Sequence, residues 1–114
     1  MRPSGVPTVD VQTLPADAVL LDVREDEEWA AGHIAGAVHV PMMQLPQRLQ
    51  LGAGPLTPDT PIVVVCKVGA RSAQVTAWLR HNGYDAVNLA GGMLAWAAAG
   101  HPMEADDNQP ARVV

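Results

Sequence analysis

The sequence predicts an α/β fold, with one domain built on a mostly parallel β-sheet. Three observations carry this prediction. Short apolar runs alternate with helix-like segments, which is the pattern of strand–helix–strand units. Residues 62–65 are Ile-Val-Val-Val, a continuous β-branched run that is typical of a parallel strand buried on both faces. The length of 114 residues suits one domain with a single core.

Strands are predicted wherever a short apolar run stands between turn-forming residues. Pro41 ends one of these runs, because proline cannot donate a hydrogen bond within a sheet. The predicted strands are residues 19–23, 38–40, 62–65 and 86–89, with Thr8 and Val9 as a short edge strand.

Helices are predicted between the strands, at residues 25–31, 42–49, 72–81 and 93–99. The first begins with acidic residues and ends at Gly32, which agrees with helix-dipole and C-cap preferences. Ser72 is the predicted N-cap of the third helix, and Asn82-Gly83 is predicted to end it.

The two ends of the chain differ from the part between them. Residues 1–7 contain two prolines and one glycine, and we expect a flexible N-terminal lead-in there. Residues 104–114 show no periodicity, and we expect a flexible tail. The domain is therefore expected to span residues 8–103.

Composition excludes several classes of protein. Hydrophobic residues make up 48% and charged residues 17%, which excludes wholesale disorder. Seven Lys and Arg against twelve Asp and Glu give a net charge of −5, so no basic face for nucleic acid is expected. No apolar run approaches the roughly 18 residues of a membrane span, and one cysteine excludes an internal disulfide framework. We expect a cytoplasmic monomer that binds neither nucleic acid nor membrane.

The candidate site is the loop that follows the apolar run 62–65, because ligands of parallel sheets bind beyond the carboxyl ends of the strands. Backbone N–H groups of the loop and the start of the next helix can attract an anion there. Gly69 permits the positive φ of a tight curl. The cations Lys67 and Arg71 favour the thiolate form of a cysteine, which is the nucleophilic form. The loop consists of Cys66, Lys67, Val68, Gly69, Ala70 and Arg71, followed by Ser72.

Cys66 is predicted to be a reactive residue rather than part of the core. A single buried cysteine often acts only as a small hydrophobic residue, but core filling needs neither two cations nor a glycine beside it. We therefore expect Cys66 to be largely ionised at pH 7. Only four residues separate Cys66 from Arg71, so the loop suits one transferred atom better than the phosphoryl group that the longer loop of cysteine phosphatases wraps. We expect Arg71 to hold the loop's shape and Lys67 to attract an anionic substrate.

Other candidate groups lie outside the loop. Asp22 and Arg24, at the end of the run 19–23, are predicted to support the loop structurally, and so is Ser72, which follows it. The acidic run 25–28 is predicted to be a solvated helix start. Gly91-Gly92 follows a predicted strand and is expected to form a turn, a second rim of the site, or both.

No metal site is predicted. His33 and His39 lie six residues apart, but no second cysteine or suitably spaced carboxylate completes a set of ligands. We expect both histidines to be buried and hydrogen-bonded.

Four blocks of the sequence occur in a characteristic order. They are Leu21-Asp22-Val23-Arg24-Glu25 with Glu28-Trp29, the segment from Gly32 to Pro41, the loop from Cys66 to Ser72, and Gly91-Gly92-Met93 with Trp96. Over about residues 8–103, these blocks make the chain resemble the single-domain rhodanese (thiosulfate sulfurtransferase-like) family. The resemblance implies a five-stranded, mostly parallel sheet with helices on both faces. It also implies a Cys66 that carries a persulfide, and no cofactor or metal.

The resemblance has two departures within the loop. Lys67 stands where many family members have arginine, and it lacks the bidentate fork of that residue. Val68 is apolar where others have a polar or cationic residue. Both positions bear on the choice of sulfur donor.

The predicted function is transfer of a sulfane sulfur from thiosulfate, or a similar small anionic donor, to a thiophilic acceptor. The acceptor is expected to be cyanide or a thiol, including the thiol of a sulfur-acceptor protein. Two alternatives stay open. One is a non-catalytic rhodanese-like sulfur-relay or interaction module, and the other is a small cysteine phosphatase or arsenate reductase, against which the loop length counts.

Overall fold

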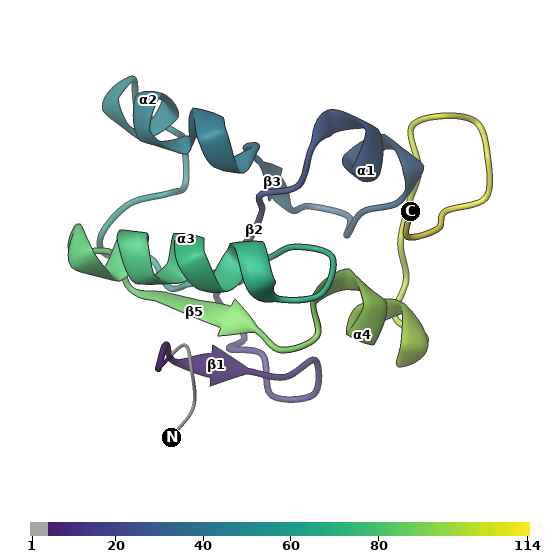
Figure 1. Cartoon of the computed structure of the whole chain (residues 1–114), viewed down its shortest axis with the longest axis horizontal. Helices are drawn as coiled ribbons and strands as arrows, with labels where there is room; N and C mark the ends of the chain where they lie inside the picture. Colours follow the sequence, from purple (N-terminus) through teal and green to yellow (C-terminus); the bar gives the residue numbers. More distant parts are fainter. Residues whose placement is uncertain (1–4) are drawn as a thin grey trace.

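The fold is built around one five-stranded sheet. In the computed structural model, which describes residues 5–114, neighbouring strands are parallel and their order is β1-β5-β4-β2-β3. Figure 1 labels β1, β5, β2 and β3 of this sheet. Residues 1–4 of the expected lead-in lie outside the described residues. The strands are β1 (Thr8–Val9), β2 (Val19–Asp22), β3 (Val38–His39), β4 (Ile62–Val65) and β5 (Ala86–Leu89).

The helices are short and lie between the strands in the chain, as the sequence predicts. Among residues 5–114, none is long and apolar enough to cross a membrane. They are α1 (Asp26–Ala31), the 3-10 turn η1 (Met42–Gln44), α2 (Leu45–Gln50), α3 (Ala70–His81) and α4 (Gly92–Ala98).

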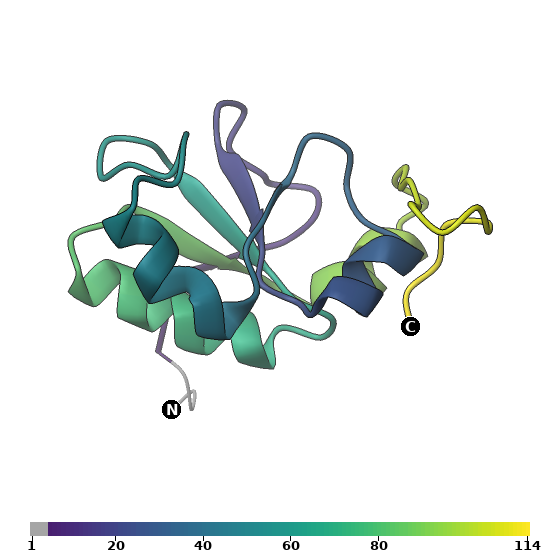
Figure 2. The same cartoon turned by 90° about the horizontal axis from the view of Figure 1, so that it is seen from above.

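Helices cover both faces of the sheet. On one face, Leu45 of α2 and Val75 and Leu79 of α3 join the core, and Figure 2 shows these two helices side by side in front of the strands. On the other face, Met93 and Trp96 of α4 join a second apolar cluster. The predicted α/β fold is therefore confirmed, with helices on both faces of a parallel sheet.

β4 is the strand that positions the candidate site. All four of its residues are buried. Because successive side chains of a strand point to opposite faces, Ile62 and Val64 belong to one cluster and Val63 and Val65 to the other. Val65 lies beside Asp22, the last residue of β2. β4 is therefore packed against apolar clusters on both faces and paired with a strand at each edge, β2 and β5. The Cys66 loop begins at the end of this strand.

The start of α3 differs from the prediction. The helix begins at Ala70 with Gly69 as its N-cap, and no side chain caps it. Ser72, predicted to be the N-cap, lies inside the first turn and is fully buried. The cap prediction is wrong because the helix already begins at Ala70, two residues before Ser72. The Ser72 hydroxyl therefore contacts the Cys66 sulfur instead of capping the helix.

The segment after residue 103 lies along the end of α1. We call residues 104–113 the C-terminal strap. Glu104 pairs with His33 in a β-bridge, the Asp106 N–H donates to the Ala30 carbonyl (2.8 Å), and the Arg112 N–H donates to the Ala31 carbonyl (3.0 Å). These bonds satisfy carbonyls that have no partner within a helix. We expected a flexible tail here because the segment shows no periodic pattern in the sequence. Contacts made through the backbone leave no such pattern, so the sequence did not reveal them.

The strap explains why Gly32 is a glycine, and this gives a test. Its φ of 178° is extended backbone that any residue adopts, but a Cβ at this position would overlap the Arg112 backbone. We expect Gly32→Ala to lower the free energy of unfolding by about 1–3 kcal/mol, as overpacking does, measured by urea denaturation. In a chain that ends at residue 103 the same substitution should cost much less. An equal cost in both chains would contradict the clash with the strap.

Candidate active site

The chain after β4 curls around the sulfur of Cys66. The Gly69 N–H donates to Sγ over 3.1 Å, and the Ser72 Oγ lies 3.2 Å from Sγ. Gly69 has a φ of +109°, in the region that favours glycine, and this conformation turns its N–H inward. Cys66 itself has no exposed surface. The loop therefore surrounds the sulfur with hydrogen-bond donors and excludes water from it.

The surroundings of the Cys66 thiol act on its pKa in opposite directions. Burial raises the pKa, because it disfavours the charged form. Hydrogen bonds from the Ser72 hydroxyl and from the backbone N–H groups of Ser72, Gly69 and Val68 lower it and together outweigh burial. The pKa consequently lies below its ordinary value, which favours the thiolate.

The start of α4 forms a second wall of the loop. The Met93 N–H donates to the Cys66 carbonyl (2.8 Å), and the Leu94 N–H donates to the Lys67 carbonyl (3.1 Å). A Cβ on Gly92 would overlap the backbone of Cys66 and Lys67, and its φ of +56° also favours glycine. Gly91-Gly92 is thus both a turn and a wall of the site, as the sequence allows.

Arg71 is bound to Glu28 of α1 rather than to carbonyls of the loop. Its two terminal nitrogens donate to the two Glu28 carboxylate oxygens over 2.8 and 2.9 Å. This bidentate bond from Arg71 lowers the pKa of Glu28 to about 2, and Glu28 in turn raises the pKa of Arg71. Arg71 is therefore a permanent cation, fixed to α1 at the entrance of α3.

Asp22 and Arg24 form a buried ion pair at the end of β2. The Arg24 Nη2 lies 2.8 Å from Asp22 Oδ2 and also donates to the Gly32 carbonyl at the end of α1 (2.8 Å). Within residues 5–114, neither side chain makes a hydrogen bond to residues 66–72. The pair joins β2 to α1, so any support it gives the loop passes through β2 and α1.

The remaining loop side chains are exposed or half-buried. Val68 is 55% exposed, and Ala70 is exposed as well. Lys67 is half-buried, and its ammonium group makes no ion pair with any of residues 5–114. Lys67 and Val68 are thus the two larger loop side chains that remain available to an incoming molecule.

Sequence reasoning missed two residues of the site, Glu28 and Asn88. Glu28 belongs to the acidic run that was expected to be solvated, but its carboxylate also closes a capping box with Glu25. Asn88 lies within β5, where its Oδ1 is 2.6 Å from Ser72 Oγ and its Nδ2 donates to the Gly69 carbonyl (3.3 Å). A buried asparagine inside an apolar strand was the signal that could have revealed it.

The two histidines stack on opposite sides of the Trp29 ring, with centroid separations of 3.7 Å for His33 and 4.6 Å for His39. His33 Nδ1 donates to the Trp29 carbonyl and His39 Nε2 to the Arg24 carbonyl. Both histidines are hydrogen-bonded as predicted, and His33 is buried, but His39 is only half-buried. In the described part of the chain, no three His, Cys, Asp or Glu side chains gather in a possible metal site.

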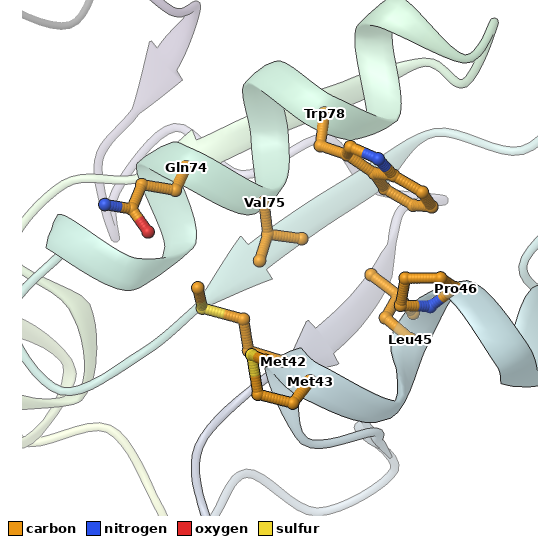
Figure 3. Close-up of a pocket in the computed structure, with 7 residues that line it drawn as sticks. All are labelled: Met42, Met43, Leu45, Pro46, Gln74, Val75 and Trp78. Carbon is orange, nitrogen blue, oxygen red and sulfur yellow. The ribbon is translucent and has the colours of Figure 1, made fainter.

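An apolar groove of about 230 Å³ lies between α3 and the segment that contains η1 and α2. Figure 3 shows Val75 and Trp78 of α3 facing Leu45 and Pro46 across it. Met42, Met43 and Gln74 complete the lining, which contains no titratable side chain. The groove offers apolar surface beside α3 but no catalytic group.

Fold and site together define a class of protein: a parallel α/β domain whose buried cysteine lies in the turn between a central strand and a helix. The chain belongs to the rhodanese-like domain family, whose sequence model matches residues 10–99. The resemblance seen in the four sequence blocks is confirmed.

Similar proteins refine this assignment. A sulfurtransferase of Allochromatium vinosum is 39% identical over 92 residues, which cover 80% of this chain and 82% of that protein. Thiosulfate sulfurtransferase 16, chloroplastic, of Arabidopsis thaliana is 36% identical, with 90% of this chain and 97% of that protein covered. The crystal structure of a rhodanese-related protein from Thermoplasma volcanium matches with a TM-score of 0.78 at 28% identity, covering 86% of this chain and 97% of that one. The chain is thus a member of the rhodanese sulfurtransferase family.

The Glu28–Arg71 pair predicts a pH-dependent contribution to stability. Glu28→Gln should lower the free energy of unfolding by at most about 1 kcal/mol at pH 7, because the pair is partly exposed. The pKa of Glu28 is lowered from 4.5 to about 2, so the contribution is complete above about pH 4.5 and is lost as the pH falls toward about 2. Urea denaturation of both proteins across this range measures it.

The matched control is Glu27→Gln, which removes the same charge from an exposed neighbour on α1. This variant should show no comparable convergence with the wild type at low pH. A Glu28→Gln effect of constant size from pH 7 to 2.5 would contradict the assigned ion pair.

Proposed function

We propose that this protein moves a sulfane sulfur from a small anionic donor, such as thiosulfate, to a thiophilic acceptor through a persulfide on Cys66. The observation that carries the proposal is the set of donors directed at the Cys66 sulfur, from the Gly69 N–H and the Ser72 hydroxyl. Family membership supports sulfur transfer, and the name of the Arabidopsis relative supports thiosulfate as the donor.

In the first step, the Cys66 thiolate attacks the outer sulfur of thiosulfate. A sulfur–sulfur bond forms on Cys66 while the bond within the donor breaks, and its electron pair leaves with sulfite. The negative charge then lies on the terminal persulfide sulfur. Backbone N–H groups of the loop stabilise this charge as they would an oxyanion.

In the second step, a nucleophilic acceptor attacks the terminal sulfur. Cyanide or a thiol takes this sulfur, and the Cys66 thiolate leaves with the bonding electrons. The enzyme then returns to its starting form. Two half-reactions that share one covalent intermediate predict ping-pong kinetics.

The two cations of the loop have different roles in this proposal. Lys67 has no ion-pair partner among residues 5–114, and its mobile charge attracts the anionic donor. Arg71 is fixed by Glu28 and contributes both a permanent positive charge and the position of the loop. Because Cys66 has no exposed surface, the donor reaches the sulfur only after a small displacement of the loop.

Mass spectrometry of the intact protein after incubation with thiosulfate tests the covalent step. The wild type should gain the mass of one sulfur atom on Cys66 and lose it after cyanide is added. Cys66→Ser should gain nothing and should retain its fold, because the serine hydroxyl is not ionised at neutral pH. Sulfur transfer to cyanide at the wild-type rate by Cys66→Ser would overturn the mechanism.

Substitution of the two cations tests their roles. Arg71→Ala should lower kcat/KM by about ten- to a hundredfold, since it removes a charge and releases the loop from α1. Lys67→Ala should mainly raise KM for thiosulfate, by about severalfold, with a smaller effect on kcat. Arg48→Ala, which removes an exposed charge on α2, is the control and should leave both constants unchanged. A larger loss with Lys67→Ala than with Arg71→Ala would reverse this assignment.

A further inference from the structure

Asn88 has no role in the steps above, yet it contacts both groups that donate to the Cys66 sulfur. It lies on β5, is 7% exposed, and has its Oδ1 2.6 Å from Ser72 Oγ. Its Nδ2 binds the carbonyl of Gly69, the residue whose N–H donates to Sγ. Asn88 therefore binds two residues, Ser72 and Gly69, each of which forms a hydrogen bond with the sulfur.

The Ser72 hydroxyl faces two acceptors with one hydrogen. Its Oγ lies 3.2 Å from Cys66 Sγ and 2.6 Å from Asn88 Oδ1. A serine hydroxyl has a single O–H donor, so only one of these bonds can use it at a time. The other contact must be made by a different hydrogen or be left without one.

The orientation of the Asn88 amide follows from its other contact. The Gly69 carbonyl can only accept, so the amide nitrogen faces it and the amide oxygen faces Ser72. The reversed amide would place two oxygen atoms against each other at the Gly69 carbonyl. Asn88 is thus an acceptor toward Ser72.

Two arrangements of hydrogens are consistent with these contacts. When Cys66 is a thiol, its S–H points to Ser72 Oγ, and the Ser72 hydroxyl donates to Asn88. When Cys66 is a thiolate, the sulfur has no hydrogen, and the Ser72 hydroxyl turns to it because a charged acceptor forms the stronger bond. Asn88 Oδ1 then faces an oxygen at 2.6 Å with no hydrogen between them.

We propose that Asn88 is a positioning residue that competes with the Cys66 sulfur for the single hydroxyl hydrogen of Ser72. Asn88 favours the neutral sulfur, and the hydroxyl turns toward Cys66 only when that sulfur becomes an anion. Within the proposed sulfur transfer, on which this consequence rests, Sγ is charged before attack and neutral in the persulfide. The hydroxyl therefore turns away after the first half-reaction and returns as Sγ leaves in the second.

The charged groups around Cys66 do not supply the same effect. Lys67 and Arg71 lie in the loop, Arg71 is paired with Glu28 of α1, and the Asp22–Arg24 pair ends β2. The spans of β5 and α4 contain no ionisable residue. A neutral substitution at position 88 leaves all of these charges in place, so its effect on the titration of Cys66 reports on the hydroxyl.

The test is the pH dependence of Cys66 alkylation by iodoacetamide, which needs no sulfur transfer. Asn88→Ala should move the midpoint down by about 0.5–1 pH unit, since Ser72 no longer has a competing acceptor. Ser72→Ala should move it up. In the Ser72→Ala background, Asn88→Ala should produce no further shift. Val87→Ala, the neighbouring position on β5, controls for loosening of the strand and should leave the midpoint unchanged.

Three results for Asn88→Ala would overturn the proposal. An unchanged midpoint would mean that Asn88 does not compete, and an upward shift would mean that its amide donates to Ser72. A downward shift that persists in the Ser72→Ala background would mean that Asn88 acts without Ser72.

If Asn88→Ala does not fold, Asn88→Asp keeps the shape of the side chain and strengthens the acceptor toward Ser72, while it removes the donor to the Gly69 carbonyl equally in both backgrounds. It should raise the midpoint more in the wild-type background than with Ser72→Ala, and an equal rise in both would overturn the proposal. A failure of this kind is separate from failure of the proposed function, which the persulfide mass measurement decides.

Discussion

The site depends on two backbone hydrogen bonds, from the N–H groups of Met93 and Leu94 to the carbonyls of Cys66 and Lys67. They turn these two carbonyls toward α4. The Lys67 carbonyl and the Val68 N–H belong to one trans peptide and point in opposite directions, so the bond from Leu94 directs the Val68 N–H toward the sulfur. Gly92 is required because a side chain at that position would separate α4 from the loop. The environment of the cysteine is therefore fixed mainly by backbone.

Two ion pairs join this backbone frame to the rest of the molecule through α1. Arg24 binds Asp22 and the carbonyl at the end of the helix, while Glu28 in the helix binds Arg71. The first pair is fully buried, so loss of one partner would leave an uncompensated charge. The second is partly exposed and adds little to stability, but it determines where the cation beside Cys66 lies. One short helix thus connects the ends of β2 and β4.

Local patterns in the sequence predicted most of the fold and pointed to a candidate site after β4. The apolar run of β4 and the glycine after Cys66 are signals carried by adjacent residues, and the structure has the buried strand and the positive φ of Gly69. The roles of Lys67 and Arg71 stay predictions. Glu28 was misassigned because its partner Arg71 lies 43 residues away, and nothing in an acidic run distinguishes a paired carboxylate from a solvated one. The cap predicted at Ser72 is wrong because a serine after a loop is a common helix cap, whereas the partners of this hydroxyl are Cys66 and Asn88. The strap contacts use backbone atoms, which every residue has.

The burial of the only cysteine among these 114 residues has a consequence for oxidative damage. An activated thiolate reacts readily with peroxides to give a sulfenic acid, and proteins that survive this step capture it with a nearby second thiol. No other residue of this chain can close such a disulfide, so rescue must come from a separate thiol. A bulky reductant cannot reach the enclosed sulfur, whereas peroxide is small enough to follow the path of the substrate. Under the proposed mechanism, a sulfur bound to Cys66 occupies that position, so an idle protein is better protected when loaded than when empty.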